Sequence, residues 1–405
     1  MSGRFPWKGH RYWLAVVFFM VAGVPGLWFP ALSNILVSGG LGGWKEIAFM
    51  LPSIAGILSP LVFAAQVDQR FEAQKVLGWI MIIGSVFLFL AFHSIEAGWG
   101  GPTFLVFFAV NALISVPAWS LLNTVALASL DDPGKSFGLF RVWGTIGWML
   151  AGLLISWLVL DFSPMAGKLA AGFRIVAGLA CFCLKPVKPR GAKPKSLAEA
   201  LGFGAFKIFK DRDQCVYFLT AFLFHIPLAS FYLHTPMHFR EMGVERVSAM
   251  MSTGQILEIF AMLLMGTAIA KFRVKQILFT ALLLGVMRYG LCAAGAHFND
   301  ISWLIVGVML HGITWTFFVE AGRVFLDRRV DRGVRAQAQA LMGFVTSGVA
   351  GVLGVLTVKF LHARLVLAEG APGWAAYWTV LSGLCLLSLL LFSIGYRGKI
   401  ALPER

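Results

Sequence analysis

Charged side chains are scarce in this sequence of 405 residues. Asp, Glu, Lys and Arg together make up only 13% of it, about half the share that is typical of soluble domains. Hydrophobic residues make up 59% of the chain, and mean hydropathy is +0.80. A soluble fold could not remove that much apolar surface from water, so the sequence predicts a chain that lies in a lipid bilayer.

Cysteine is also rare, and the pattern of the five cysteines excludes several classes of protein. They show neither the spacing of a disulfide framework nor histidine partners at metal-ligand spacing, so we interpret them as packing residues and expect no metal and no cofactor. No clustered nucleophile and no pair of catalytic carboxylates is found in the sequence either, which argues against an enzyme. The cysteines are Cys181, Cys183, Cys215, Cys292 and Cys385.

Long apolar runs, by contrast, recur along the whole chain. Each is about 20 residues long, the length of helix that crosses the hydrocarbon core of a bilayer. None shows the alternating pattern of a transmembrane β-barrel strand. We therefore expect an all-α membrane protein with twelve transmembrane helices, at 12–36, 46–67, 74–96, 102–127, 137–160, 166–184, 214–238, 248–270, 274–296, 301–325, 335–360 and 374–396.

The distribution of Lys and Arg predicts the orientation of these spans. With both termini on one side of the membrane, 24 basic residues flank the spans on that side and only five flank them on the other. Cytoplasmic loops carry the excess of Lys and Arg, so both termini are expected in the cytoplasm and the chain in the inner (plasma) membrane as a multi-pass protein. The net charge of +15 then faces anionic lipid headgroups, and no nucleic-acid partner is indicated.

A polar segment at 185–213 separates the first six predicted spans from the last six. Its Pro, Gly and Lys content indicates a cytoplasmic linker, and its stretch 196–209 is expected to form an amphipathic helix on the membrane surface. The chain would thus comprise an N-terminal six-helix bundle (1–184), the linker and a C-terminal six-helix bundle (214–405).

Two six-helix halves joined by a basic linker resemble the major facilitator superfamily, in which the halves rock around a site near the middle of the bilayer. The short loop after the second span holds Asp68 and Arg70. These two residues resemble the gating loop of that superfamily.

Polar side chains within a span raise the free energy of membrane insertion, by about 2.5–3.5 kcal/mol for a charged residue in the middle of the helix. Such residues therefore mark candidate functional positions. In the fifth span, Arg141, Thr145 and Trp148 lie on one helical stripe. We interpret them as a cation, a hydrogen-bond donor and an aromatic surface facing a cavity. For Arg141 the alternative is an arginine that extends to the membrane interface.

The eighth and ninth spans carry opposite charges. Gln255 and Glu258 share a face of the eighth, where the carboxylate must be protonated, paired or open to water. Arg288, in the ninth, is expected to pair with a buried carboxylate and to be structural, with contact to the substrate as the alternative. Arg174, in the sixth span, has no role that the sequence indicates.

In the tenth span, His311 and Trp315 lie on one stripe. A histidine there could carry a proton or bind a ligand, and a packing histidine is the alternative. Glu320 and Arg323 are three residues apart and are expected either to pair or to serve as a proton site (Glu320) and a gating charge (Arg323).

Prolines indicate breaks in two further spans. Pro25 and Pro30 flank Trp28 in the first span, and Pro227 precedes Tyr232 in the seventh. A proline removes one hydrogen bond of the backbone, which suits a gating helix, although proline is also tolerated in ordinary spans.

Several stretches resemble one family within the superfamily, the nucleoside:proton symporters. They are VPAWSLLNTVALASLDDPGKSFGLFRVWGTIGW, TGQILEIFAMLL, KFRVKQILFTALLLGVMRYGL, LHGITWTFF and RAQAQALMGFVTSGVAGVLG. By this resemblance the nucleoside pocket is lined by Arg141, Thr145, Trp148, Gln255, Glu258, His311 and Trp315. The family has an aspartate where this chain has Thr316, and amide side chains where it has Ala229 and Tyr232.

The sequence thus predicts a secondary active transporter that works by alternating access, with proton-coupled uptake of a nucleoside or a nucleoside-like solute. A transporter or uniporter of the same fold for a sugar or an organic anion is the alternative. The chain is expected to be a monomer in the bilayer. The candidate substrate-binding residues are Trp28, Arg141, Thr145, Trp148, Tyr232, Gln255, Glu258, His311, Trp315 and Thr316, and the candidate proton-coupling residues are Glu258, His311 and Glu320.

Overall fold

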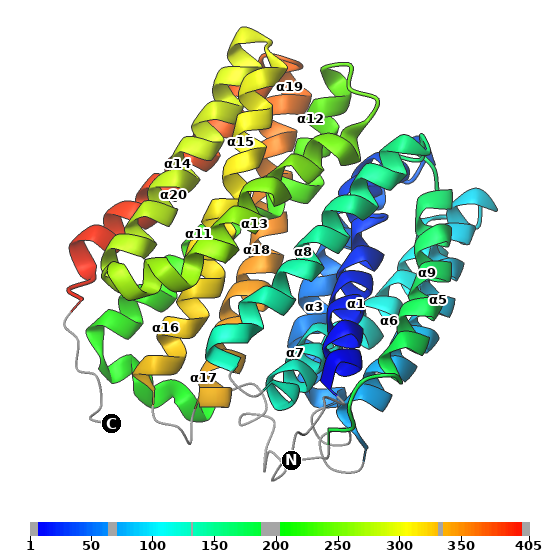
Figure 1. Ribbon diagram of the computed structural model, residues 1–405. Helices are drawn as coiled ribbons and strands as arrows, with labels where there is room; N and C mark the ends of the chain where they lie inside the picture. The colour runs from blue at the N-terminus through cyan, green and yellow to red at the C-terminus, as the bar shows by residue number, and fades with distance from the viewer. Residues whose placement is uncertain (1–6, 64–70, 131–132, 188–202, 331–334, 399–405) are drawn as a thin grey trace, which may run out of the picture. The chain divides into compact units, whose positions relative to one another are not determined.

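The computed structural model describes residues 7–63, 71–130, 133–187, 203–330 and 335–398, and every regular element in these ranges is helical (Figure 1). The chain divides into two compact units. Unit 1 comprises Met1–Pro194 with Glu245–Ser252, and unit 2 comprises Lys195–Val244 with Thr253–Arg405.

Two of the predicted spans in unit 1 are interrupted helices. The first is interrupted after Gly26, where Pro30 lies in a short 3-10 turn that begins at Phe29, as its prolines predicted. The fourth is interrupted at Val116, just before Pro117. The helical elements of unit 1 are α1 (Trp7–Gly26), η1 (Phe29–Ala31), α2 (Leu32–Ser38), η2 (Gly42–Trp44), α3 (Lys45–Phe63), α5 (Ala73–Glu96), α6 (Gly101–Ser115), α7 (Pro117–Ser129), α8 (Pro133–Trp157) and α9 (Met165–Cys181).

In the described part of unit 2, three π-helical segments, η4, η6 and η7, lie within otherwise α-helical spans. Such segments are often found at functional sites. The elements are η3 (Phe203–Lys210), α11 (Arg212–Leu233), α12 (Thr235–Glu241), α13 (Val247–Lys271, its first turns counted with unit 1), α14 (Val274–Phe298), α15 (Ile301–Thr314), η4 (Trp315–Glu320), α16 (Ala321–Arg329), α17 (Arg335–Gly343), η6 (Phe344–Ala350), α18 (Gly351–Leu361), η7 (His362–Val366), α19 (Leu367–Glu369) and α20 (Gly373–Gly395).

Ten helical segments in the described ranges are long and apolar enough to cross a membrane, and they coincide with ten of the predicted spans. At the other two predicted positions lie α3 and the 17-residue α9. The ten segments are Arg11–Ser38, Ala73–Glu96, Gly101–Ser129, Phe137–Trp157, Arg212–Glu241, Val247–Lys271, Val274–Phe298, Ile301–Arg329, Gln337–Glu369 and Gly373–Gly395.

The predicted break at Pro227 is wrong in its position. Helix α11 continues through Pro227 to Leu233, and the interruption falls at His234, with Pro236 in the first turn of α12. The carbonyl of Pro227 accepts hydrogen bonds from the hydroxyls of Ser230 and Tyr289, both at 2.7 Å.

Two other predictions concern segments that the structure describes in part or not at all. The predicted amphipathic helix at 196–209 is described only from Phe203, and there Phe203–Lys210 forms a 3-10 helix. Asp68 and Arg70 lie outside the described residues.

Close packing of α1 against α8 in unit 1 depends on glycine. A Cβ at Gly147 would lie 2.1 Å from the backbone oxygen of Phe19, and one at Gly26 would lie 2.7 Å from the backbone oxygen of Trp148. Small residues let membrane helices approach in this way. The crossing fixes the part of α8 that carries Thr145 and Trp148.

We expect the Gly147→Ala substitution to destabilise the protein by about 1–3 kcal/mol, because the added methyl group meets rigid backbone. The melting temperature of purified protein measures this. Gly172→Ala is the matched control, since a Cβ at Gly172 would meet nothing within 4 Å. Equal melting temperatures for the two variants would contradict the packing argument.

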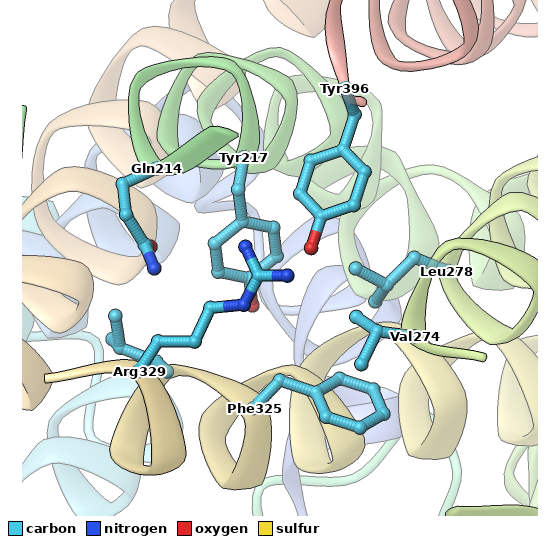
Figure 2. Close-up of a pocket in the computed structure, with 8 residues that line it drawn as sticks. Gln214, Tyr217, Val274, Leu278, Phe325, Arg329 and Tyr396 are labelled. Atoms are coloured by element: carbon cyan, nitrogen blue, oxygen red, sulfur yellow. The ribbon is translucent and has the colours of Figure 1, made fainter. Parts of the chain in front are cut away.

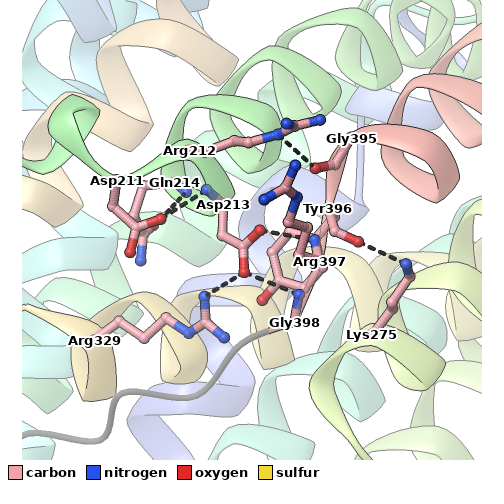
Figure 3. A network of polar contacts seen from close by, with 10 residues as sticks. All are labelled: Asp211, Arg212, Asp213, Gln214, Lys275, Arg329, Gly395, Tyr396, Arg397 and Gly398. Atoms are coloured by element: carbon pink, nitrogen blue, oxygen red, sulfur yellow. Dashed lines mark hydrogen bonds and ion pairs between the residues drawn. The ribbon is translucent and has the colours of Figure 1, made fainter.

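At the end of unit 2 where α11 begins and α20 ends, a polar network joins four helices (Figure 3). The Asp213 carboxylate accepts hydrogen bonds from the backbone N–H groups of Arg397 (2.8 Å) and Gly398 (2.9 Å), and it lies 3.7 Å from the Arg329 guanidinium. The Lys275 ammonium donates to the backbone oxygen of Tyr396 at 2.6 Å.

Candidate functional site

The predicted site residues of unit 2 gather around Arg288 on α14. Its Nη1 lies 2.9 Å from Nδ1 of His311 on α15, and its Nη2 donates to the Tyr289 hydroxyl at 3.1 Å. The guanidinium also lies over the Phe231 ring, 4.6 Å from its centroid, and 4.5 Å from that of Tyr289. Among the described residues Arg288 has no carboxylate within ion-pair distance, so its expected acidic partner is replaced by a histidine.

This arrangement determines the protonation of His311. A guanidinium can only donate hydrogen bonds, so Nδ1 of His311 must accept, and the imidazole proton is assigned to Nε2. The ring is buried and stacks on Phe231 with 3.8 Å between centroids. A second positive charge 2.9 Å from Arg288 is strongly disfavoured. His311 therefore remains neutral, which argues against its predicted role as a proton carrier.

The polar residues of α13 lie beside this cluster. Tyr232 of α11 shares a side-chain hydrogen bond with Gln255 and lies within the electrostatic influence of Glu258 and Arg288. Both Gln255 and Glu258 are buried, with exposed fractions of 4% and 7%. Tyr232 also packs edge-on against His311, with 6.4 Å between ring centroids. A phenol, an amide, a carboxylate and a guanidinium thus lie close together in unit 2.

Gly312 brings α15 against the turn of α13 that carries Glu258. A Cβ at Gly312 would lie 2.2 Å from the backbone oxygen of Gly254 and 2.4 Å from the backbone nitrogen of Glu258. Because neither backbone atom can move easily, only glycine permits this contact. The contact fixes the position of α15, the helix that carries His311, against α13.

The remaining candidates of the tenth span lie in or next to the π-helical segment η4. Trp315 tilts toward His311, with 6.1 Å between ring centroids. Thr316 is fully buried, and within the described part of the chain its hydroxyl has no hydrogen-bond partner. Glu320 lies 3.7 Å from Arg323, which confirms that these two residues pair.

In unit 1, Arg141 of α8 lies over the ring of Trp119 of α7, 4.3 Å from its centroid. Thr145, one turn further along α8, is buried, and Trp148 packs edge-on against Phe29, with 6.3 Å between centroids. The three predicted residues of α8 therefore follow one face of the helix, with Arg141 supported by an aromatic side chain.

Trp28 lies in a different environment from the other candidates. Its ring packs edge-on against Phe29, Phe92 and Phe108, with centroids 5.4–5.7 Å apart, and it is only 7% exposed. This enclosure by phenylalanines indicates a packing role in unit 1.

A small pocket lies at the end of unit 2 where α11 begins (Figure 2). It does not provide an alternative substrate site. It is lined by residues of α11, α14 and α16 together with Tyr396, and it has room for about one water molecule. A metabolite does not fit there. The lining residues are Gln214, Tyr217, Val274, Leu278, Phe325, Leu326, Arg329 and Tyr396.

Three aromatic residues of these clusters were not predicted from the sequence: Trp119, Phe231 and Tyr289. Trp119 lies two residues after a proline that interrupts a span, and Tyr289 directly follows a buried arginine. These neighbours could have marked Trp119 and Tyr289 as candidate site residues in the sequence. Phe231 lies in an apolar run that offers none.

Two known structures share the fold of this chain. The crystal structure of the nucleoside transporter NupG superposes with a TM-score of 0.80 at 22% identity, covering 96% of this chain and 99% of that one. That of a D-xylose-proton symporter superposes with a TM-score of 0.70 at 13% identity, covering 96% and 99%. The fold of this chain is therefore that of these two transporters.

Sequence comparison is more specific. The family model described as Nucleoside H+ symporter matches residues 10–400. Among proteins of Escherichia coli (strain K12), the chain is 28% identical to YegT over 390 residues (92% of this chain, 90% of that one) and 24% identical to the xanthosine permease over 405 residues (95% of each). It is 25% identical to the nucleoside permease NupG of the same organism over 366 residues (85% of each). The chain belongs to the nucleoside:proton symporter family.

Proposed function

We propose that this protein imports nucleosides across the inner membrane and couples uptake to protons. The observation that carries the proposal is the cluster of Tyr232, Gln255, Glu258, Arg288 and His311 in unit 2. It offers donors, acceptors and one carboxylate within an otherwise apolar helical bundle. Ribose hydroxyls and the edge of a base need such partners. The names of the family and of its relatives support the same substrate class.

The roles follow from the chemistry of the side chains. Gln255 and Tyr232 hydrogen-bond the substrate, and Trp148 and Trp315 stack on its ring. Glu258 carries the proton, because it is a buried carboxylate and because His311 is held neutral by Arg288. Arg141 and Thr145 of unit 1 add a cation and a hydroxyl.

The membrane arrangement belongs to the same proposal. We infer twelve spans, with α3 and α9 completing the ten long apolar helices, and both termini in the cytoplasm as the Lys and Arg distribution indicates. The two six-helix bundles are 1–184 and 214–405, joined by the linker at 185–213. The transporter acts as a monomer.

Uptake into proteoliposomes tests this function. Purified protein should accumulate radiolabelled uridine, adenosine, inosine or xanthosine above the external concentration when the lumen is alkaline, and a protonophore should abolish the accumulation. Equilibration without accumulation would identify a uniporter. Uptake of a sugar or an organic acid in place of any nucleoside would contradict the proposed substrate class.

Glu320 is the rival proton site, and its pairing with Arg323 argues against it. We expect Glu320→Gln to retain accumulation within about two-fold of wild type, because an i,i+3 pair contributes only about 0.2–0.5 kcal/mol. Uptake measured from pH 5.5 to 8 should keep its wild-type pH dependence. Loss of accumulation that is restored by adding Thr316→Asp would instead assign the proton site to this part of η4.

A further inference from the structure

Arg174 is a buried cation that the proposed mechanism does not use. It lies on α9 and is 3% exposed. Nη1 donates to Oδ1 of Asn111 at 2.6 Å, and Nη2 donates to Oγ of Ser115 at 2.8 Å and to the backbone oxygen of Ile80 at 3.2 Å. No carboxylate lies within ion-pair distance of Arg174 in the described part of the chain. A cation buried among neutral partners is costly within a membrane and demands a specific role.

A glycine on α5 provides the space for this side chain. A Cβ at Gly84 would lie 2.2 Å from Nη2 of Arg174 and 2.6 Å from its Cζ. The guanidinium therefore occupies the volume that any other residue at position 84 would fill. Arg174 thus connects α9, α5 and α6 through one planar group.

The two side-chain acceptors of Arg174 lie in the last turn of α6. Asn111 and Ser115 are one turn apart, and the Ser115 hydroxyl also donates to the backbone oxygen of Asn111. The helix is interrupted at Val116, and Pro117, which has no N–H, begins α7. A proline removes one hydrogen bond of the helix and favours a kink. Arg174 therefore holds the chain directly before a point where the backbone alone is weak.

The first turn of α7 carries Trp119, on which Arg141 rests at 4.3 Å. The edge of Phe18 packs against the same ring, with 6.1 Å between centroids. A Cβ at Gly144 would lie 3.3 Å from Cη2 of Trp119 and 3.4 Å from Nη1 of Arg141, so glycine leaves room for both. Arg141 is thus oriented by a tryptophan whose position depends on the interruption of the fourth span.

We propose that Arg174 is a positioning residue for substrate binding. Its hydrogen bonds hold the end of α6 in place and fix the direction in which α7 continues after the interruption. Trp119 is thereby placed beneath Arg141. The inference rests on the proposed function, in which Arg141 contacts the nucleoside. It concerns a residue to which no substrate contact is assigned. All the groups involved lie in unit 1.

The test removes the hydrogen bonds between Arg174 and α6 from either side. It measures the environment of Trp119 as well as substrate binding. The variants are Arg174→Gln and Asn111→Leu, with Thr103→Val as the control, because the Thr103 hydroxyl, near the beginning of α6, donates to the backbone oxygen of Trp99 just before the helix. Binding of uridine to the purified protein is measured by calorimetry. In parallel, the 14 tryptophans are labelled with 5-fluorotryptophan, and the Trp119 line of the 19F spectrum is assigned with Trp119→Phe.

Loss of these hydrogen bonds should raise the Kd for uridine about 2- to 30-fold, the range set by a cation–π contact of roughly 0.5–2 kcal/mol. The Trp119 line should shift in Arg174→Gln and in Asn111→Leu without substrate, and the control should change neither quantity. Combining the two substitutions should add little to either one alone, because both remove the same interaction. Arg174→Lys, which keeps the charge but not the two-pronged geometry, should fall between wild type and Arg174→Gln.

An Asn111→Leu variant with a wild-type Trp119 line and wild-type Kd would overturn the proposal, even if its melting temperature fell. This variant also decides the matter if Arg174→Gln does not fold. Should the wild-type protein bind no nucleoside, the proposed function fails, but the substrate-free 19F line still shows whether Arg174 positions Trp119.

Discussion

In the Glu258→Gln variant, concentrative uptake of nucleoside should fall at least about 100-fold while the protein still folds and inserts. Glutamine matches glutamate in size and keeps hydrogen-bonding capacity, but it cannot bind and release a proton. Glu258 is buried beside Gln255 and close to the cluster around Arg288. Accumulation against a gradient requires a group that changes protonation between the two access states, so a neutral side chain uncouples transport.

Two measurements separate coupling from binding. Accumulation under an imposed pH gradient should be lost, whereas exchange of labelled for unlabelled nucleoside across the same liposomes should persist, because exchange moves no net proton. Glu241→Gln is the matched control: that carboxylate accepts a hydrogen bond from the Trp374 indole and lies outside the site. Full wild-type accumulation by Glu258→Gln would end its role in proton coupling.

Most of the helical architecture could be predicted from the sequence, because length and apolarity alone decide whether a segment can cross a bilayer. The interruptions were harder. In the first span the prolines at 25 and 30 mark the interruption correctly, whereas in the seventh the helix tolerates Pro227 and ends at Leu233. Whether a proline ends a helix depends on which neighbouring groups satisfy the freed carbonyls, and one sequence does not show its neighbours.

The same limit applies to the site. Residues that share a stripe of one helix, such as Thr145 and Trp148 or Gln255 and Glu258, follow from the helical repeat. Partners on different helices do not. Arg288 was expected to pair with a carboxylate, but it contacts His311 instead. The hydrogen-bond acceptors of Arg174 lie on two other helices. Spacing within a helix cannot show which of many polar residues a long, flexible arginine side chain reaches.

Replacement of Arg288 is the second change with a large expected effect. Arg288→Met removes two charge-assisted hydrogen bonds, each contributing about 1.5–3 kcal/mol, and leaves Nδ1 of His311 and the Tyr289 hydroxyl without their donor. The packing against Phe231 survives in part because methionine is also long and apolar. We therefore expect a loss of about 3–5 kcal/mol of unfolding free energy, seen as a much lower melting temperature, together with a loss of substrate binding.

The pH dependence of that variant tests the reason for the effect. With the guanidinium 2.9 Å away, His311 is held neutral. In wild type the unfolded chain binds a proton at this imidazole at low pH and the folded protein does not, so His311 lowers stability as the pH falls. Without the guanidinium, the folded protein can also take up the proton, so the melting temperature of Arg288→Met should change less between about pH 8 and 5 than that of wild type. His311→Gln alone should reduce the change in the same way, because glutamine does not titrate. If Arg288→Met and wild type show the same pH profile, His311 is not the group that Arg288 controls, and the electrostatic argument that leaves Glu258 as the proton carrier loses its basis.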